Sequence, residues 1–314
     1  MNFQQLRAVR EAVRRNFNLT DVAEALHTSQ PGVSRQIREL EDELGLEIFI
    51  RAGKRLTGLT AAGQRVVPWV EKLLLDAENL HRASEDFLRG DTGTLSIAAT
   101  HSQARYALPS AVHDFRATHP LVQFQLHQGS PSQVAQMLLT GEADIGIASH
   151  ELAEHPDLVA LPCYRWTHSV VVPPGHALLD GPLTLARLAE HPLITYEHGF
   201  TGRSSIDNAF QRAGLSTQVT LTAMDADVIK TYVGLGLGVG IIAAIAFDEA
   251  RDAPLVAMDA RQLFPINTTS VAVRRGGLLR GFAYDFIHTF APHLSRLAVE
   301  QAQAAPSGVA QAPL

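Results

Sequence analysis

A change of periodicity near residue 90 divides the chain into two parts that must fold differently. Before it, apolar residues recur at helical intervals, and residues 61–88 are typical of one long helix. After it, runs such as LSIAAT (95–100) and DIGIAS (144–149) alternate with helical segments, which predicts parallel, doubly wound sheets. The polar, glycine-containing segment 88–94 joins the two parts. We therefore expect an α/β multidomain protein.

Charge is spread unevenly along the 314 residues. Residues 1–66 carry a net charge of +2, residues 67–90 carry −2, and residues 91–314 carry −6. An acidic body cannot bind a polyanion over its whole surface, so any contact with nucleic acid must use a local patch in the first 66 residues. The chain has no run of about 18 apolar residues, and we expect no membrane span. The one cysteine, Cys163, suits a reducing cytoplasm and leaves no thiolate zinc site.

Residues 1–59 carry the signals of a winged helix-turn-helix domain. Two helical segments precede a third. Ser29 is the expected N-cap of this third helix, Pro31 lies in its first turn, and Gly45 ends it. The following EIFIRAGKRLTG is typical of a β-hairpin, the wing. In this order of elements the third helix enters the major groove of DNA.

The exposed face of that third helix carries side chains that can read bases. Glutamine pairs with adenine and arginine with guanine, while hairpin cations can hold flanking phosphates. The alternative to DNA binding is an ordinary solvent-exposed helix face beside a charged hairpin. The DNA-binding candidates are Ser29, Gln30, Pro31, Ser34, Arg35, Arg38, Arg51, Lys54 and Arg55.

Residues 60–88 form a predicted linker helix with a strict 3.5-residue apolar repeat. This repeat is typical of a seam between two helices, and a core helix of a single domain is the alternative. Pro68 falls inside the helix and should kink it or weaken one turn. The seam positions are Val66, Val70, Leu73, Ala77, Leu80, Ser84 and Phe87.

Residues 89–300 are expected to form a two-lobed ligand-binding domain. The first lobe should comprise 93–163 and 269–300, with a closing helix over 278–297, and the second lobe 164–268. The tail 301–314 is rich in Ala, Pro and Gln, which predicts disorder.

Hydroxyl groups and predicted helix starts follow several strands of these lobes. Ligands of such sheets bind at the carboxyl ends of strands, where free backbone N–H groups and hydroxyls suit a small anion. Ordinary helix capping is the alternative for each residue. These candidates are Thr100, Ser102, Gln103, Gly129, Ser130, Ser149 and Thr201.

The sequence of the two lobes contains no recognisable catalytic or cofactor-binding motif. The sequence has no G-x-S-x-G, and GLGLGVG (234–240) does not satisfy the dinucleotide fingerprint and instead favours close packing of a helix on a strand. The 14 histidines are scattered, and the spacing of His150 and His155 is poor for one helical face. We expect no enzyme activity, no cofactor and no metal.

Many segments, in order, resemble one family. TSQPGVSRQIRELEDELG followed by IFIRAGKRLTGLTAAG resembles the LysR-type transcriptional regulators. ATHSQARYALP, HQGSPSQ, LPCYRW, GFTGRSSID and DADVIKTYVGLGLGVG are similar to the CysB/Cbl branch, which controls sulfur assimilation genes. The resemblance implies a homotetramer, built as a dimer of dimers, that binds double-stranded promoter DNA and contacts RNA polymerase. Its alternatives are a regulator of an unrelated pathway and a ligand-independent DNA-binding protein.

The resemblance also implies an effector cleft like that of periplasmic binding proteins. The effectors it implies are sulfate, O-acetylserine, N-acetylserine or adenosine phosphosulfate. Thr100, Gln103 and Thr201 should line the anion site, together with Ser102 and Ser149, which stand where the best-known members carry threonine. Tyr164 and Trp166, beside the crossing between lobes, should sense closure, with simple packing as the alternative.

Overall fold

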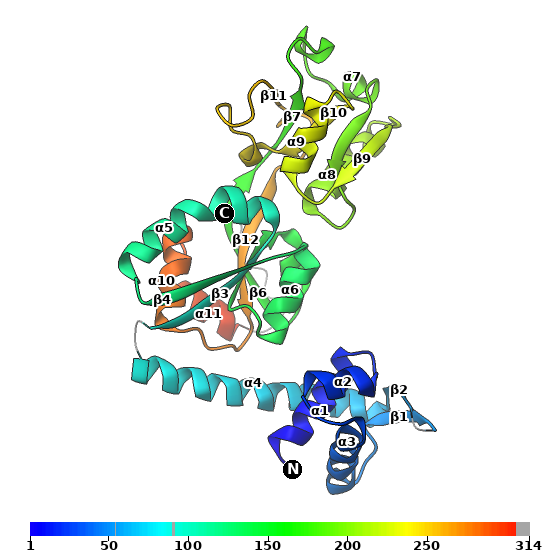
Figure 1. Ribbon diagram of the computed structural model, residues 1–314, viewed down its shortest axis with the longest axis vertical. Helices are drawn as coiled ribbons and strands as arrows, with labels where there is room; N and C mark the ends of the chain where they lie inside the picture. The colour runs from blue at the N-terminus through cyan, green and yellow to red at the C-terminus, as the bar shows by residue number, and fades with distance from the viewer. Residues whose placement is uncertain (54, 90–91, 306–314) are drawn as a thin grey trace. The chain divides into compact units, whose positions relative to one another are not determined.

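The chain folds into two compact units, Met1–Glu85 and Asp86–Leu314 (Figure 1). The computed structural model describes residues 1–53, 55–89 and 92–305, without the side chains of residues 85–89, 150, 151 and 201. Within that part of the chain, every helix is too short or too polar to cross a membrane.

The amino-terminal unit is a winged helix-turn-helix, as predicted. Ser29 caps the third helix by accepting a hydrogen bond from the Gly32 backbone N–H at 3.3 Å, and Gly45 ends that helix with a left-handed φ of 66°. The elements are α1 (Phe3–Arg14), α2 (Leu19–Ala25), α3 (Gln30–Leu44), the antiparallel hairpin of β1 (Phe49–Ala52) and β2 (Arg55–Leu59), and α4 (Ala61–Arg89).

The long helix α4 belongs partly to the core of this unit. Val70 and Leu74 are 3% exposed and pack against the apolar side chains of the three-helix core. Leu73 and Leu80, in contrast, are 43% and 73% exposed. The predicted seam therefore divides: its first turns pack within the unit, and the stripe from Leu73 to Leu80 lies uncovered. Phe87 lies outside the described side chains, and α4 runs through Pro68 without interruption.

The carboxyl-terminal unit contains two five-stranded sheets, one for each lobe. The first, in the order β4-β3-β5-β12-β6, comprises β3 (Gly93–Ala99), β4 (Val122–Gln128), β5 (Ile145–Ser149), β6 (Leu158–Trp166) and β12 (Asn267–Arg274). The second, in the order β11-β7-β10-β8-β9, comprises β7 (His168–Val172), β8 (Leu193–Tyr196), β9 (Val219–Ala223), β10 (Val239–Ala243) and β11 (Val256–Asp259).

Helices cover these sheets and begin where strands end (Figure 1). In the first lobe they are the π-helix η1 (Gln103–Ala107), α5 (Leu108–Thr118), α6 (Pro131–Thr140), the 3₁₀ turn η2 (His150–Glu154), α10 (Gly281–Phe290) and α11 (Arg296–Ala304). In the second they are η3 (Ala177–Leu179), α7 (Leu185–Ala189), α8 (Thr201–Arg212), α9 (Ala226–Gly234) and η4 (Ala244–Ala246).

The sheets are mixed, which corrects the prediction of parallel sheets. β3 pairs in parallel with β4 and β5, and β8 with β9 and β10, but β12 and β7 run antiparallel to their neighbours. The antiparallel strands are those through which the chain passes between lobes, because β6 continues into β7 and the chain returns as β12. The first lobe accordingly extends to Trp166, three residues beyond the predicted boundary.

Two further predictions at the carboxyl end are wrong. The helix expected over 278–297 is two helices, α10 and α11, with Pro292 between them, since proline lacks the N–H that a helix interior needs. Residues 301–304, assigned to a disordered tail, continue α11, and the Gln303 amide donates to the carbonyls of Arg274 and Gly277. Residues 306–314 lie outside the described residues.

One glycine of GLGLGVG, Gly240, serves helix–strand packing, as the sequence indicated. A Cβ at Gly240 would lie 2.8 Å from a Val233 methyl carbon, so close approach of α9 to β10 requires glycine at this position. A Cβ at Gly238 would lie 2.5 Å from the Pro192 carbonyl oxygen, at the backbone that precedes β8.

Candidate DNA-binding surface and effector cavity

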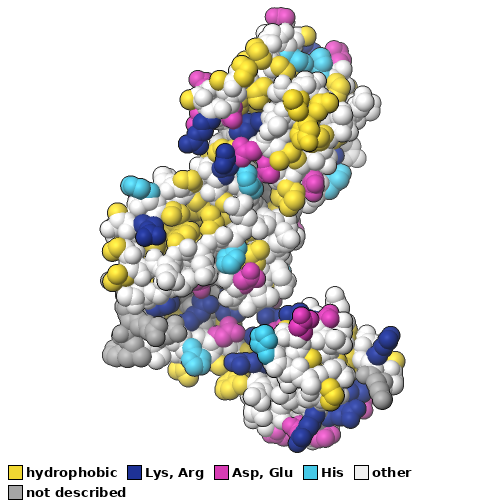
Figure 2. Space-filling model, viewed as in Figure 1, with side chains coloured by type: hydrophobic (Ala, Val, Ile, Leu, Met, Phe, Trp, Pro, Cys, Tyr) yellow, Lys and Arg dark blue, Asp and Glu magenta, His cyan; other side chains and the backbone are white. Residues whose placement is uncertain are grey.

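The amino-terminal end of α3 presents the predicted base-reading residues on the surface. Gln30 and Arg38 are exposed, Ser34 is half-buried, and the Arg35 side chain is 81% exposed. The Arg35 guanidinium pairs with Glu39 one turn along the helix, at 2.7 Å. An exposed pair of this kind costs little to exchange for a contact with DNA. Figure 2 shows basic side chains over the α3 and hairpin side of this unit.

The hairpin is fixed to α3 by a buried carboxylate. Glu41 is 7% exposed, and its Oε1 accepts hydrogen bonds from the backbone N–H groups of Ile48 at 2.8 Å and Phe49 at 3.1 Å. Its Oε2 accepts from the Arg51 guanidinium at 2.6 Å. Arg51 therefore helps to position the wing, and its contact with a DNA phosphate stays a prediction. Arg55 is exposed, and Lys54 lies outside the described residues.

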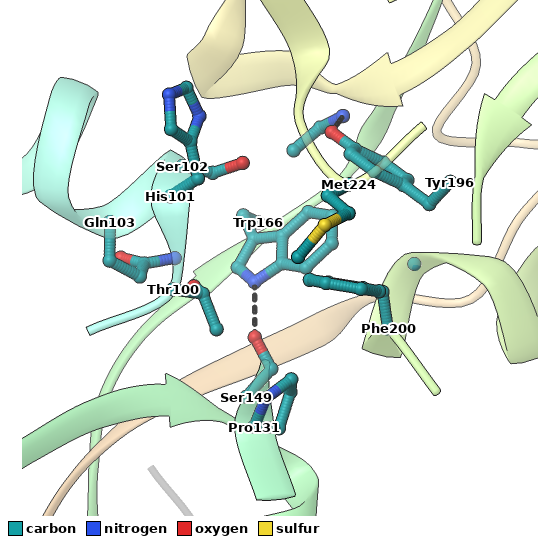
Figure 3. Close-up of a pocket in the computed structure, with 12 residues that line it drawn as sticks. Thr100, His101, Ser102, Gln103, Pro131, Ser149, Trp166, Tyr196, Phe200 and Met224 are labelled. Carbon is teal, nitrogen blue, oxygen red and sulfur yellow. Dashed lines mark hydrogen bonds between the residues drawn. The ribbon is translucent and has the colours of Figure 1, made fainter. Parts of the chain in front are cut away.

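A cavity lies between the two lobes at the carboxyl ends of their strands (Figure 3). Of the predicted effector residues, Thr100, Ser102, Gln103, Ser149 and Trp166 line it. The first three follow β3, while Ser149 and Trp166 end β5 and β6. The Trp166 indole N–H donates to the Ser149 hydroxyl at 3.4 Å. One short turn after β3 thus supplies most of the polar wall.

Gln103 is held in one orientation by two partners. It is 3% exposed; its amide nitrogen donates to the Thr269 hydroxyl at 3.2 Å, and its amide oxygen accepts from the Tyr164 hydroxyl. Tyr164 does not itself line the cavity, but its hydroxyl helps to hold Gln103; its role in sensing closure stays a prediction. Burial raises the pKa of Tyr164, which keeps the phenol protonated as a donor.

Three other residues predicted to bind the effector are Gly129, Ser130 and Thr201. Gly129 and Ser130 do not line the cavity: the Ser130 hydroxyl caps α6 by accepting from the Gln133 N–H at 3.3 Å, and the next residue, Pro131, reaches the cavity instead. Ser130 is thus a helix cap, which was the alternative considered for it. The Thr201 side chain lies outside the described part of the structure.

The second lobe contributes an apolar wall that sequence reasoning missed. Tyr196, Phe200 and Met224 face the hydroxyl side of the cavity across Trp166 (Figure 3). Each lies at or just after the carboxyl end of a strand, or directly before α8, but an apolar side chain at such a position does not stand out from the core residues around it. His101, Gly202 and Ala243 complete the missed lining.

Among the described residues, those that line the cavity include neither lysine nor arginine. Two titratable side chains at the cavity are neutral, because burial raises the pKa of Tyr196 to about 12 and lowers the pKa of His168, behind Trp166, to about 4. Helix α8 starts at the cavity, and Phe200 at its N-cap makes no side-chain capping bond. Backbone N–H groups, hydroxyls and the Gln103 amide are therefore the available donors to an anion.

One carboxylate cluster beside the cavity has the composition of a metal site. Single ligand atoms of His101, Asp225 and Asp227 lie within 4.8 Å of one another. Asp227 is, however, already paired with Arg105 at 2.6 Å and with Lys230 at 3.2 Å. These cations supply the positive charge that an ion would bring, so we assign no metal.

Family models match both units. The model described as the bacterial regulatory helix-turn-helix protein, lysR family, matches residues 3–64, and that of the LysR substrate binding domain matches residues 88–295. The regulator SsuR of Burkholderia cenocepacia is 57% identical over 296 residues, 94% of this chain and 96% of its own. CysB of the same species is 50% identical (96% and 97% covered), and cbl of Escherichia coli K12 is 50% identical (91% of each).

Solved structures agree with this likeness. The cofactor-binding domain of the Cbl transcriptional regulator matches with a TM-score of 0.66 and 46% identity, over 68% of this chain and 95% of that domain. Full-length CbnR in complex with its target DNA matches with a TM-score of 0.55 over 92% of this chain and 99% of its own. At 21% identity, the CbnR match shows a shared fold.

Proposed function

Because this chain belongs to the LysR family of DNA-binding transcriptional regulators and is not an enzyme, we propose that it controls sulfur-related genes in response to a small anionic effector. The observation that carries the proposal is the cavity between the lobes, in which hydroxyls and an amide face an apolar wall and the described lining includes no lysine or arginine. Its relatives SsuR, CysB and cbl support the choice of pathway.

The effector acts by favouring one arrangement of the two lobes. It shifts that equilibrium only by its differential affinity for the two arrangements. Candidates are sulfate, O-acetylserine, N-acetylserine and adenosine phosphosulfate, whose oxygens match the polar wall. The chain works in the cytoplasm on promoter DNA, where its bound state alters contact with RNA polymerase.

A thermal-shift series tests the effector site. At a concentration 100 times its Kd, an effector stabilises the full-length protein by about 2.7 kcal/mol, which raises Tm. We expect one of the four candidates, or thiosulfate, to do so. Thr100→Val removes a hydroxyl from the cavity at nearly constant volume and should weaken binding about tenfold, since a hydrogen bond to a charged group is lost. Thr220→Val, on an exposed position of β9, is the control. Equal shifts for the wild type and Thr100→Val would remove Thr100 from the site.

Two exposed arginines should affect DNA binding in different ways. We expect Arg38→Ala to reduce discrimination between specific and random duplex by about 1–3 kcal/mol, because a base contact from α3 is lost. Arg55→Ala, on the hairpin, should weaken both duplexes alike and reduce the salt dependence. Competition binding with both duplexes at two salt concentrations measures this. Equal losses on both duplexes for both variants would refute the assigned roles.

The uncovered stripe of α4 supports one of the two interfaces of the proposed dimer of dimers. Leu73 and Leu80, exposed in the single chain, have the spacing of a two-helix seam. Sedimentation velocity at micromolar concentration should give a tetramer, and Leu73→Glu with Leu80→Glu should give smaller species. A wild-type protein that is strictly monomeric would contradict this assembly.

A further inference from the structure

A second polar cluster joins the two lobes next to the effector cavity. Arg105 and Tyr106 come from η1 in the first lobe, and Asp227 and Lys230 come from α9 in the second. The Tyr106 hydroxyl donates to Asp227 Oδ1 at 2.6 Å and accepts from Lys230 Nζ at 3.0 Å, while Arg105 Nε lies 2.6 Å from Asp227 Oδ2. Figure 2 shows basic and acidic side chains side by side where the lobes meet.

The residues of the cluster that lie in the second lobe are held in place by contacts within that lobe. Lys230 is 6% exposed, and its ammonium group donates to Asp252 at 2.8 Å and to the Ala246 carbonyl at 2.8 Å. Burial alone would raise the pKa of Asp227, but the hydrogen bonds from Tyr106 and Lys230 hold it below the ordinary value. Asp227 therefore remains a charged acceptor at neutral pH, and Tyr106 and Arg105 bond to it from the first lobe at 2.6 Å each.

The same short segment touches both the cavity and the second lobe. Gln103 lines the cavity, and Arg105 and Tyr106 follow it within the π-helix η1. A π-helix widens the turn and is frequent at functional sites. Gln103 is thus only two or three residues along the chain from Arg105 and Tyr106, which contact the second lobe. His101, also in the lining, places its Nε2 3.9 Å from Asp227 Oδ2.

We propose that Tyr106, Arg105, Asp227 and Lys230 form an interlobe latch that holds the lobes at the separation of the closed cavity before any effector binds. A ligand that spans two freely moving lobes binds only the fraction of molecules already closed, so its apparent affinity falls with that fraction. The latch keeps the closed fraction high and sets effector affinity through residues that need not touch the effector. This consequence for affinity rests on the proposed function, whereas the latch itself does not.

The distance between lobes tests the latch without a ligand. Spin labels at Gln136→Cys on α6 and Gln211→Cys on α8, both exposed positions, report the separation by pulsed electron resonance. The native Cys163 is buried, and burial raises the pKa of its thiol to about 12, so it does not compete for label. Labelled full-length protein is mixed with excess unlabelled protein so that distances within one chain dominate.

We expect one narrow distance distribution for the wild type and a broader, longer one for Tyr106→Phe with Arg105→Gln. Tyr232→Phe, which removes a hydroxyl from the same helix α9, should match the wild type. The stabilising ligand of the thermal-shift series should bind the double variant about tenfold more weakly at an unchanged ligand-free Tm. An unchanged narrow distribution in the double variant would overturn the latch. A broadened distribution in a protein that none of the ligands stabilises would leave the latch standing and refute the effector proposal.

Discussion

Replacing Glu41 by alanine is expected to lower the free energy of unfolding of the amino-terminal unit by about 3–5 kcal/mol. The change leaves two buried backbone N–H groups, those of Ile48 and Phe49, without their acceptor and leaves the Arg51 charge unpaired. Because these bonds hold the hairpin against α3, the wing should lose its position before the helices unfold. Urea unfolding, together with hydrogen exchange at residues 48 and 49, measures both effects.

Asp42→Ala is the matched control for this prediction. Asp42 is the next residue along α3, and its side chain is exposed, so its loss should change stability by less than about 0.5 kcal/mol. A Glu41→Ala protein with native stability and protected amides at residues 48 and 49 would contradict the role given to Glu41.

Acid should destabilise the carboxyl-terminal unit through His168. This side chain is fully buried, both ring nitrogens lack hydrogen-bond partners among the described residues, and burial lowers its pKa from 6.5 to about 4. Above pH 6.5 neither state binds the proton, so the full stability is present. As the pH falls below 6.5, His168 becomes protonated in the unfolded chain but stays neutral in the folded chain. The free energy of unfolding therefore falls by about 3 kcal/mol by pH 4.

His168→Phe isolates this contribution, because phenylalanine fits beside the Trp166 and Phe264 rings that flank the imidazole. Between pH 7 and pH 5, the stability of the variant relative to the wild type should rise by about 2 kcal/mol. His113→Phe, at a histidine whose side chain is 85% exposed, should show no such trend. A difference between His168→Phe and the wild type that is constant with pH would contradict a neutral, buried His168.

The helix-turn-helix was predictable because its signals are local. Ser29 and Gly45 mark the ends of α3 by their own backbone chemistry, which needs no information from the rest of the fold. The pairing of Arg51 with Glu41 was not predictable, because Glu41 lies ten residues away and meets Arg51 only once the hairpin folds back. A charged side chain on a wing is otherwise indistinguishable from a phosphate contact.

The cavity was predictable on its polar side alone. Hydroxyls after β3 and β5 stand out because they interrupt apolar strands, whereas Tyr196 and Met224 resemble the core residues around them. The antiparallel direction of β7 and β12 was not predicted, because strand direction depends on the chain crossing twice between lobes. Sequence periodicity identifies strands and carries no sign of their direction.

Control of DNA binding by the cavity is tested most directly by one titration. The full-length protein is bound to a duplex selected from random sequence, and affinity and DNA bending are followed as each candidate effector is added. We predict that the ligand that stabilises the protein also changes the DNA complex, and that Thr100→Val needs about tenfold more of it. A ligand that occupies the cavity yet leaves both affinity and bending unchanged would contradict the account.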